Sequence, residues 1–298
     1  MIGSLVEMLR PFGEVREHEP MSRHTTLGVG GPARVYFRPH DRASLVQAVR
    51  ALDASLPCLP LGRGSNLLVL DEGFDGVVID LAPLNHVVCK GNLVMAEAGA
   101  RMSRVASACV QAGLSGLEFL ATVPGDIGGG VAMNAGAFGQ QISDCLREVC
   151  CLLRDGSEIW LSADKLSMGY RHCRLPDGGI VLEAQFELQP DSSEAVRDRI
   201  RSMRARRSET QPLDQPNCGS VFTNPEGRHA AQLIEAAGLK GKTFGKARIS
   251  EKHANFIVTE PGATASDVLA LIRLARRSVR EQFGIDLIPE VRIVGGQA

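Results

Sequence analysis

The most constraining feature of this 298-residue chain is a stretch of small residues, Val123–Gly139 (VPGDIGGGVAMNAGAFG). Nine of its residues are glycine or alanine, so it carries too few bulky side chains to pack well by itself. Glycine has no Cβ, which allows the backbone to approach a ligand closely. The stretch therefore predicts a loop that lies against a large flat ligand.

A second glycine loop, Leu61–Leu68 (LGRGSNLL), follows a short apolar strand. Its glycines would let backbone amides approach an anion, and Ser65 and Asn66 would add side-chain donors. Taken alone, this loop is equally well explained as a tight turn. Together with Val123–Gly139 it indicates a dinucleotide cofactor that is held without a Rossmann fold.

Two other nucleotide-type motifs fail on their context. Gly28–Ala33 fits G-x-G-x-x-A, but a proline and a strand-like run follow it where a helix is needed. Ala236–Thr243 fits a relaxed P-loop pattern, but a helix precedes it and no helix is expected after it. We expect neither motif to bind a nucleotide.

Composition narrows the class of protein. The formal net charge is -1, which favours neither nucleic acid nor a membrane surface as a partner. The start of the chain carries Glu7 and Arg10 within its apolar pattern, so no secretory signal is expected there. The uncharged stretch Ile127–Ser143 is rich in Gly, Asn and Gln, which does not suit lipid. These features predict a soluble, cytoplasmic protein.

The eight cysteines form no C-x-x-C pair and show no matching histidine spacing, so we expect no metal site. Cys58, Cys89 and Cys109 lie in apolar surroundings and are predicted to be buried thiols. A reducing compartment agrees with this cysteine pattern.

Hydrophobic periodicity and glycine or proline breaks divide the chain into three regions, 1–80, 81–190 and 191–298, with a break at Gln189-Pro190-Asp191. The arginine-rich outer faces of two helices in the last region are expected to be solvated rather than bound to nucleic acid. The expected strands are Ala33–Phe37, Cys58–Leu61, Val77–Leu81, Glu158–Leu161 and Ile180–Leu188. The expected helices are Arg42–Leu52, Met102–Ala112 (ended by Gly113), Ser193–Arg206, Ala230–Ala237 and Ser266–Phe283.

Further motifs occur in order from about Thr25 to Gly295, and with the two glycine loops they resemble the UDP-N-acetylenolpyruvoylglucosamine reductase family. They are HTTLGVGG (24–31), GYR (169–171), CGSVFTNP (218–225), residues 234–241, residues 250–257 and PEVR (289–292). The short segment 171–180 is similar to the class that lacks an additional tyrosine-bearing loop.

The resemblance implies an α+β fold. A two-subdomain FAD-binding region of the vanillyl-alcohol-oxidase (PCMH) type, 1–80 and 81–190, would be followed by a smaller α/β substrate domain, 191–298. It also implies non-covalent FAD, NADPH as co-substrate, and reduction of UDP-N-acetylglucosamine enolpyruvate to UDP-N-acetylmuramate for peptidoglycan synthesis. A monomer is expected, with no nucleic-acid or membrane partner.

Three catalytic residues follow from matching this family's motifs. Hydride transfer to an enol ether conjugated to a carboxylate leaves negative charge that needs positive charge and a proton donor. Arg171 matches the first role, because a guanidinium can hold a carboxylate with two parallel bonds. Ser220 matches the proton donor, and Glu290 matches a third residue that would orient a water molecule or polarise the developing enolate.

The resemblance also assigns binding residues. The cofactor would contact the two glycine loops at Gly62, Arg63, Gly64, Ser65, Asn66, Leu67, Pro124, Gly125, Gly128, Gly129, Asn134, Ala135 and Gly136. The substrate would contact Asn224, Arg207 and His253. The chain departs from the usual pattern at Thr122, Cys173, Thr223 and Lys246, and Thr223 stands where a basic residue is common, which puts a phosphate contact there in doubt.

Two alternatives remain open from the sequence. One is another flavin oxidase or dehydrogenase of the same superfamily that acts on a small alcohol. The other is a catalytically silent module that binds a nucleotide sugar. Reduction of the flavin by NADPH, followed by its reoxidation with the enolpyruvyl substrate, would distinguish all three.

Overall fold

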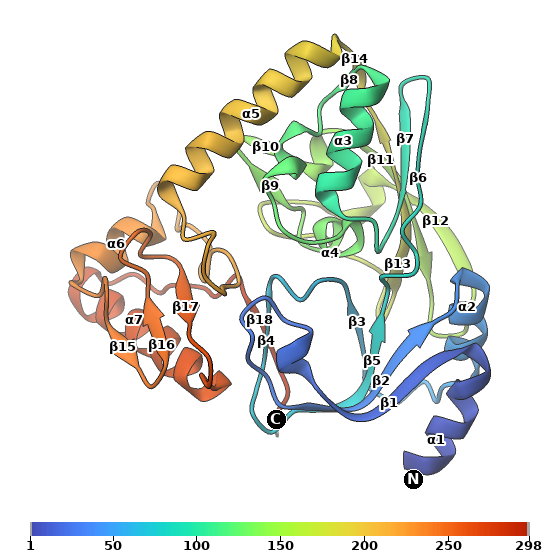
Figure 1. The fold of residues 1–298 in the computed structure, drawn as a ribbon, viewed down its shortest axis with the longest axis horizontal. Coiled ribbons are helices and arrows are strands. Elements are labelled where there is room, and N and C mark those ends of the chain that lie inside the picture. Colours follow the sequence, from blue (N-terminus) through green and yellow to red (C-terminus); the bar gives the residue numbers. More distant parts are fainter. Residues whose placement is uncertain (1, 297–298) are drawn as a thin grey trace. The chain divides into compact units, whose positions relative to one another are not determined.

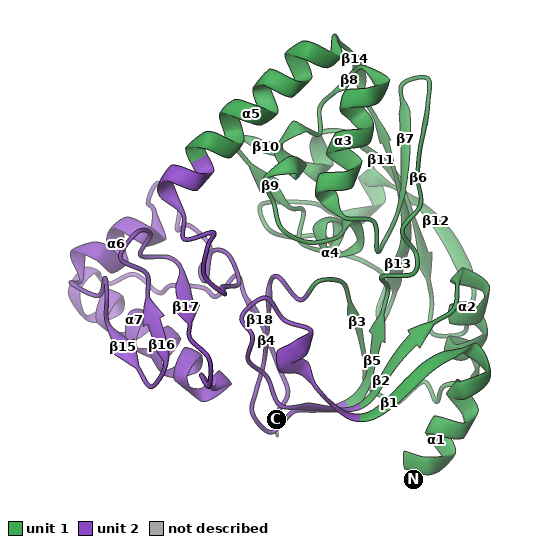
Figure 2. Cartoon of the chain, in the orientation of Figure 1, with its two compact units in different colours: residues 1–17, 35–63, 76–206 green, residues 18–34, 64–75, 207–298 purple. Residues whose placement is uncertain are grey.

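A computed structural model describes residues 2–296 and groups the chain into two compact units. The first unit comprises residues 1–17, 35–63 and 76–206, and the second comprises residues 18–34, 64–75 and 207–298 (Figure 2). Two early segments are therefore grouped with the last third of the chain. The finer division into domains 1–80, 81–190 and 191–298 stays a prediction.

A four-stranded sheet, in the order β1-β2-β5-β3, begins the fold (Figure 1). Strands β3 and β5 run parallel, with Cys58 opposite Val77. Helix α2 starts after Asp41, whose carboxylate accepts a hydrogen bond from Ser44 N at 2.8 Å and so caps the helix. The elements are α1 (Ile2–Leu9), β1 (Gly13–Pro20), β2 (Pro32–Pro39), α2 (Arg42–Ala51), β3 (Cys58–Leu61) and β5 (Phe74–Asp80).

A five-stranded antiparallel sheet, in the order β12-β11-β13-β7-β6, forms the other half of the first unit. Helix α3 ends as the sequence predicts, because Gly113 adopts the left-handed conformation (φ +63) that closes a helix. The elements are β6 (Val87–Lys90), β7 (Leu93–Glu97), α3 (Met102–Ala112), β8 (Leu114–Ser115), α4 (Ile127–Ala132), β9 (Gly136–Ala137), β10 (Gln140–Gln141), β11 (Leu146–Leu152), β12 (Glu158–Ser162), β13 (Ile180–Glu187) and β14 (Gln189–Pro190).

The expectation of a simple loop over Val123–Gly139 needs correction, because its centre is helix α4. Ile127 and Val131 are fully buried, and α4 packs against β7 and β13. Glycines disfavour an isolated helix, but here the burial of two branched side chains stabilises one short turn. The predicted break at Gln189-Pro190 is also not the end of the first unit, since β14 pairs with β8 and the unit continues to Arg206.

Helix α5 (Ser193–Thr210) runs from the first unit into the second, with Val196 and Ile200 buried on one side. The solvated outer face that the sequence predicts is observed at Arg197, Arg201 and Arg204, which are exposed, but Arg199 differs. Arg199 donates to Glu118, which is buried, and to Asp191. These ion pairs hold the arginine against its own unit, so it is not simply a solvated charge.

The second unit contains the sheet β15-β16-β17, the parallel pair β4 and β18, and helices α6 and α7. The carboxylate of Asp71 accepts hydrogen bonds from the amides of Ala265 and Ser266, both at 2.8 Å, at the start of α7. The elements are β4 (Leu67–Val69), α6 (Ala230–Ala236), β15 (Thr243–Phe244), β16 (Ala247–Ile249), β17 (Ile257–Thr259), α7 (Ala265–Phe283) and β18 (Arg292–Val294).

Neither of the two other nucleotide-type motifs lies between a strand and a following helix, as a nucleotide site requires. Gly28–Ala33 leads into strand β2, and the P-loop-like residues end at β15 after helix α6.

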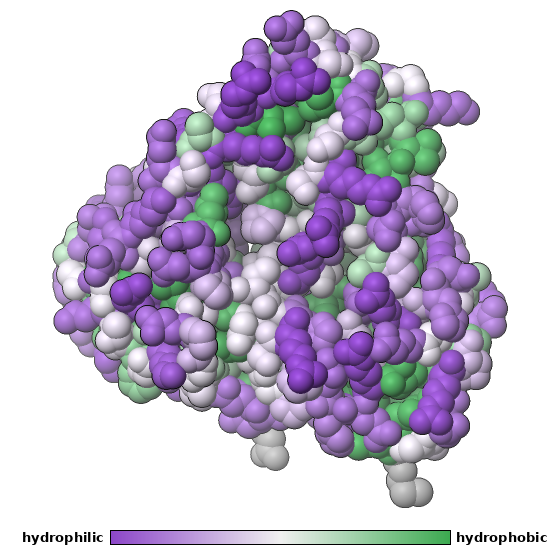
Figure 3. Space-filling model, viewed as in Figure 1, coloured by the Kyte–Doolittle hydropathy of each residue, from purple (hydrophilic) through white to green (hydrophobic). Residues whose placement is uncertain are grey.

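Of the three cysteines predicted to be buried, Cys109 is buried and Cys58 and Cys89 are half-buried. Among residues 2–296, no helix is long and apolar enough to cross a membrane, and no group of His, Cys, Asp and Glu is arranged to hold a metal. The face in Figure 3 is mostly hydrophilic, with scattered apolar patches.

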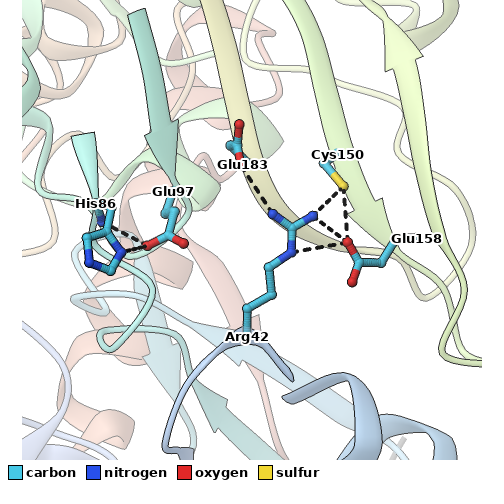
Figure 4. A network of polar contacts seen from close by, with 6 residues as sticks. All are labelled: Arg42, His86, Glu97, Cys150, Glu158 and Glu183. Carbon is cyan, nitrogen blue, oxygen red and sulfur yellow. Dashed lines mark hydrogen bonds and ion pairs between the residues drawn. The ribbon is translucent and has the colours of Figure 1, made fainter. Parts of the chain in front are cut away.

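An ion-pair network joins α2 to the five-stranded sheet (Figure 4). Arg42 donates to Glu158 on β12, to Glu183 on β13 at 3.2 Å, and to the sulfur of Cys150 on β11 at 3.1 Å. Burial raises the pKa of the Cys150 thiol to about 11, so the sulfur is a neutral partner. The network thus joins helix α2 to three strands of the five-stranded sheet.

We expect Arg42→Met to lower the free energy of unfolding by about 1.5–3 kcal/mol, because methionine keeps the apolar stem but leaves two carboxylates without their cation. Urea unfolding followed by circular dichroism measures this. Arg10→Met is the control, since its pair with Glu7 is well exposed and should contribute about 0–1 kcal/mol. Equal midpoints for both variants would contradict the proposed importance of the network.

Candidate active site

The first glycine loop links β3 to β4 and is shaped by the protein itself. Gly64 has φ +60, and a Cβ there would lie 2.2 Å from the carbonyl oxygen of His24. A Cβ at Gly62 would lie 2.9 Å from Oδ2 of Asp126. Gly64 is therefore required for the fold, whereas a larger residue at Gly62 would require the Asp126 side chain to shift. The side chain of Arg63 between them is exposed.

The second glycine loop is held by backbone hydrogen bonds to the segment between β7 and α3. Met102 N donates to Gly125 O at 3.1 Å, and Gly128 N donates to Ala98 O at 2.8 Å. A Cβ at Gly128 would lie 3.0 Å from the Cβ of Ala98, so this glycine allows the close approach. These bonds fix the backbone of the loop before any ligand binds.

Gly129 differs from its neighbours. It is exposed, and a Cβ there would meet no heavy atom within 4 Å among the non-adjacent residues that the structure describes. Pro124, at the start of the loop, is also exposed. No contact within the described part of the protein requires a glycine at position 129. A flat ligand lying on the loop would require one, because any Cβ would point toward it. The open face of Gly129 therefore fits the dinucleotide predicted for this loop.

Asn134 organises the end of the loop. It is completely buried and adopts φ +41. Its amide nitrogen donates to Gln141, Ser143 and the carbonyl of Gly169, and its Oδ1 accepts from Ser143 N. These bonds give Asn134 a positioning role within the protein; its predicted contact with the cofactor stays a prediction.

Arg171 is placed by the same arrangement. The residue has φ +55 and follows Gly169, which forms an isolated bridge with His172. Its Nη2 donates to the carbonyl of Gly136 at 2.9 Å, and its guanidinium lies 5.1 Å from the centre of the Tyr170 ring. The cation is thus held beside the second glycine loop, near Ala135 and Gly136, where the sequence places the cofactor.

Ser220 and Glu290 lie on neighbouring segments of the second unit. The amide of Glu290 donates to Val221 O at 2.8 Å, directly after Ser220. Buried Asn255 fixes the serine segment, because its side chain accepts from Phe222 N at 3.0 Å and donates to Phe222 O at 2.8 Å. The structure therefore brings together two of the three predicted catalytic residues within this unit.

The first glycine loop reaches the same segment through Asn66. Its side-chain amide donates to the carbonyl of Glu290 at 3.0 Å, and Arg292 N donates to its backbone carbonyl at 3.0 Å. These bonds accompany the parallel pairing of β4 with β18, in which Leu67 lies opposite Arg292. Asn66 was predicted to contact the cofactor, and the structure adds that its amide holds Glu290 in place.

Two of the three predicted substrate residues, Arg207 and His253, lie near each other. Arg207 and Lys240 lie close enough to His253 for their positive charges to lower its pKa, although burial against Phe256 is the larger cause. His253 Nδ1 accepts a hydrogen bond from Asn255 N at 3.3 Å, which leaves the proton of the neutral ring on Nε2. Lys240 lies in the family segment 234–241, but sequence reasoning assigned it no contact with the substrate.

Asn224, the third predicted substrate residue, and the two departures Thr223 and Lys246 have contacts of their own. The Oδ1 of Asn224 accepts from Ala230 N at 3.0 Å and so satisfies an amide at the start of α6. The hydroxyl of Thr223 donates a hydrogen bond to the carbonyl of Ile288 at 3.3 Å. Lys246, which also departs from the family pattern, donates to Pro261 O at 3.0 Å. The hydrogen bonds of all three side chains thus stabilise the local fold of this unit.

Two protein-family models match successive segments of the chain. The FAD binding domain matches residues 33–162, and the C-terminal domain of UDP-N-acetylenolpyruvoylglucosamine reductase matches residues 211–294. The α+β fold, with a flavin-binding region followed by a smaller C-terminal domain, is confirmed by these matches, and so is FAD as the cofactor.

Relatives match along nearly the whole chain. The UDP-N-acetylenolpyruvoylglucosamine reductase of Methylococcus capsulatus is 47% identical over 281 residues, which cover 94% of this chain and 92% of that protein. The enzyme of the same name from Alkalilimnicola ehrlichii is 43% identical over 284 residues, 95% of each chain. The crystal structure of UDP-N-acetylenolpyruvylglucosamine reductase from Thermus caldophilus superposes with a TM-score of 0.81 at 36% identity, covering 94% of this chain and 98% of that one.

We expect Gly129→Val to reduce the FAD content of the purified protein at least severalfold, because a branched side chain would fill the open face of the glycine loop. Flavin absorbance relative to protein absorbance measures this. Gly3→Val is the matched control: Gly3 is also a helical glycine with open space around its Cβ position, but it lies in α1, away from both loops. Full flavin content in a folded Gly129→Val protein would remove this residue from the cofactor site.

Proposed function

The chain belongs to the UDP-N-acetylenolpyruvoylglucosamine reductase family, and from this premise we propose that it reduces UDP-N-acetylglucosamine enolpyruvate to UDP-N-acetylmuramate with NADPH. Arg171, Ser220 and Glu290 would act on the enolpyruvyl group. The observation that carries this assignment is the hydrogen bond from Glu290 N to Val221 O, which supports placing two of these side chains at one substrate.

The glycine loops would hold FAD through backbone contacts. When bound, FAD supplies the redox chemistry, taking a hydride from NADPH and delivering it to the enolpyruvyl double bond. The exposed Gly129 and Arg63 suit this cofactor, since one offers a flat apolar approach and the other a positive charge for its diphosphate. Ser65 would add a hydroxyl donor to the same group.

Arg171 would stabilise the negative charge that develops on the substrate. Hydride arriving at the terminal carbon spreads charge over the neighbouring carbon and the attached carboxylate. A guanidinium already oriented by Gly136 O and the Tyr170 ring needs little reorganisation to meet that charge. The left-handed backbone at Arg171, which is uncommon for a non-glycine residue, is consistent with a position set by function.

Ser220 would donate the proton that completes the reduction, and Glu290 would orient that proton transfer. The preceding Gly219 has φ +75 with open space around its Cβ position, which leaves the serine at the tip of a turn. Asn255 fixes the residues that follow it. The backbone beside Ser220 is thus held in place, which supports its proposed role as a general acid.

The substrate's diphosphate would lie near Arg207, His253 and Asn224. The positive charge of Arg207 beside His253 supports an anion here, and Lys240, which also pairs with Glu235 at 2.8 Å, joins the proposed set. We further propose that the protein acts in the cytoplasm, because both of its nucleotide substrates are charged molecules that do not cross membranes. The monomer stays a prediction. Size-exclusion chromatography with light scattering tests the oligomeric state.

We expect Arg171→Lys to lower kcat with the enolpyruvyl substrate roughly 10-fold to 10³-fold, because lysine keeps the charge but loses the planar pair of donors. Arg174→Lys is the control, since Arg174 is an exposed arginine in the same segment. Steady-state assays of both variants, with FAD content measured in parallel, check this. Near-normal turnover for Arg171→Lys would give Arg171 a structural role only.

Ser220→Ala should separate the two half-reactions. Reduction by NADPH needs no acid at this position and should keep its normal rate, whereas reoxidation by the enolpyruvyl substrate should slow by roughly 10²–10⁴-fold. Anaerobic stopped-flow absorbance follows each half-reaction, with Ser278→Ala on α7 as the control. If both half-reactions slow equally, or if reoxidation stays within a few-fold of normal, Ser220 is not the proton donor.

A further inference from the structure

Asp126 is a buried carboxyl group within the second glycine loop, and the roles assigned so far do not use it. It is 5% exposed, and within residues 2–296 its Oδ1 has no hydrogen-bond partner. Buried polar atoms in native proteins are nearly always bonded, so an unsatisfied carboxyl oxygen calls for a partner that is absent here. The glycine loop is also where the cofactor is proposed to bind.

The position of Asp126 makes the missing bond more informative. The residue immediately precedes helix α4, where an aspartate ordinarily accepts a bond from a helix amide. No such cap bond forms among the described residues. The other oxygen, Oδ2, lies where a Cβ at Gly62 would approach to 2.9 Å, so the carboxyl group reaches toward the first glycine loop. A carboxyl group of the second glycine loop thus faces Gly62 of the first.

Charged groups from several elements face this carboxyl group. Arg63, after β3, and Arg101, before α3, are its positive neighbours, and Arg101 also forms an isolated backbone bridge with Asp126. Asp80, at the end of β5, is the negative neighbour. Asp80 is itself bound to the Tyr36 hydroxyl at 2.6 Å and faces Arg38 at 3.7 Å. Two exposed arginines beside an unsatisfied oxygen favour an anionic ligand.

An ionised Asp126 would repel that ligand, whereas the neutral acid could donate to it. Burial raises the pKa of Asp126 to about 6, against the opposing effect of the two arginines. A diphosphate brought close would raise the pKa further, because a second negative charge disfavours ionisation. Ligand binding near neutral pH would then be coupled to the uptake of a proton.

We propose that Asp126 contacts the diphosphate of FAD as a neutral acid, takes up one proton from solvent as the cofactor binds, and donates a hydrogen bond from Oδ1 to a phosphate oxygen. This inference rests on the proposed assignment of both glycine loops to FAD. It adds a cofactor residue that the glycine pattern does not reveal, and it makes the affinity for FAD depend on pH.

The direction of the pH dependence follows from proton linkage. The bound state holds one more proton than the free state, so the dissociation constant rises with pH. Above about pH 6, the increase should approach tenfold per pH unit until the pKa of the bound acid is reached. The fluorescence of FAD released on dilution of the flavoprotein, measured from about pH 5.5 to 8, gives this constant.

Asp126→Asn should bind FAD with a nearly constant affinity over this range, and more tightly than the unmodified protein at the alkaline end, because an amide remains neutral and still donates. Asp155→Asn is the control, since Asp155 is an exposed carboxylate in the turn between β11 and β12, and it should keep the original slope. A flat or opposite slope in the unmodified protein, or the original slope in Asp126→Asn, would overturn the proposal.

A second measurement needs no variant. Calorimetric titration of the FAD-free full-length protein with FAD at pH 7.5, in two buffers of different ionisation enthalpy, counts the protons exchanged per cofactor. The proposal requires uptake close to one proton, and zero uptake or proton release would contradict it. If FAD fails to bind at any pH, the failure lies with the assignment of the glycine loops and not with Asp126 alone.

Discussion

The buried side-chain amide of Asn134 makes the hydrogen bonds on which the site residues of the first unit depend. Through Gln141 and Ser143 the amide fixes the chain after the glycine loop, and through Gly169 O it holds the segment that carries Arg171. Loss of this side chain would leave several buried groups unsatisfied at once. The position of Arg171, the proposed catalytic cation, is therefore tied to the shape of the second glycine loop.

The second unit uses a buried asparagine in a similar way. Asn255 bonds both the amide and the carbonyl of Phe222, and its own carbonyl accepts from Val221 N. Glu290 N then bonds Val221 O. In both units, an amide that can donate and accept simultaneously holds an irregular segment in one conformation, which regular secondary structure would not do. Rigid placement of this kind is what general acid catalysis and charge stabilisation require.

The sequence predicted several of the regular elements because their signals are local, but it did not predict α1, β1, β7 or β11. Met102–Ala112 and Cys58–Leu61 match the observed bounds, since apolar periodicity and a glycine at the helix end depend only on neighbouring residues. It did not predict α4, whose stability comes from burial against β7 and β13. It also did not predict that residues 18–34 and 64–75 group with the last third, because that grouping depends on contacts distant in sequence.

The glycine pattern could not separate two physical requirements. Gly62, Gly64 and Gly128 permit close approaches within the protein, whereas Gly129 is open to a ligand. Composition alone treats all four alike. The roles of Arg171, Ser220 and Glu290 came from family resemblance, since a serine in a turn or a glutamate after a proline has no distinctive pattern. Asp126 went unnoticed because only the structure reveals that one of its oxygens is buried and unbonded.

The central claim is that this chain passes reducing equivalents from NADPH to an enolpyruvyl nucleotide sugar. The most direct test is an anaerobic redox cycle of the purified flavoprotein followed by flavin absorbance. One equivalent of NADPH should bleach the oxidised flavin, and UDP-N-acetylglucosamine enolpyruvate should restore its absorbance while one equivalent of UDP-N-acetylmuramate forms. Absorbance that returns only when oxygen is admitted, with the nucleotide sugar unchanged, would contradict the account.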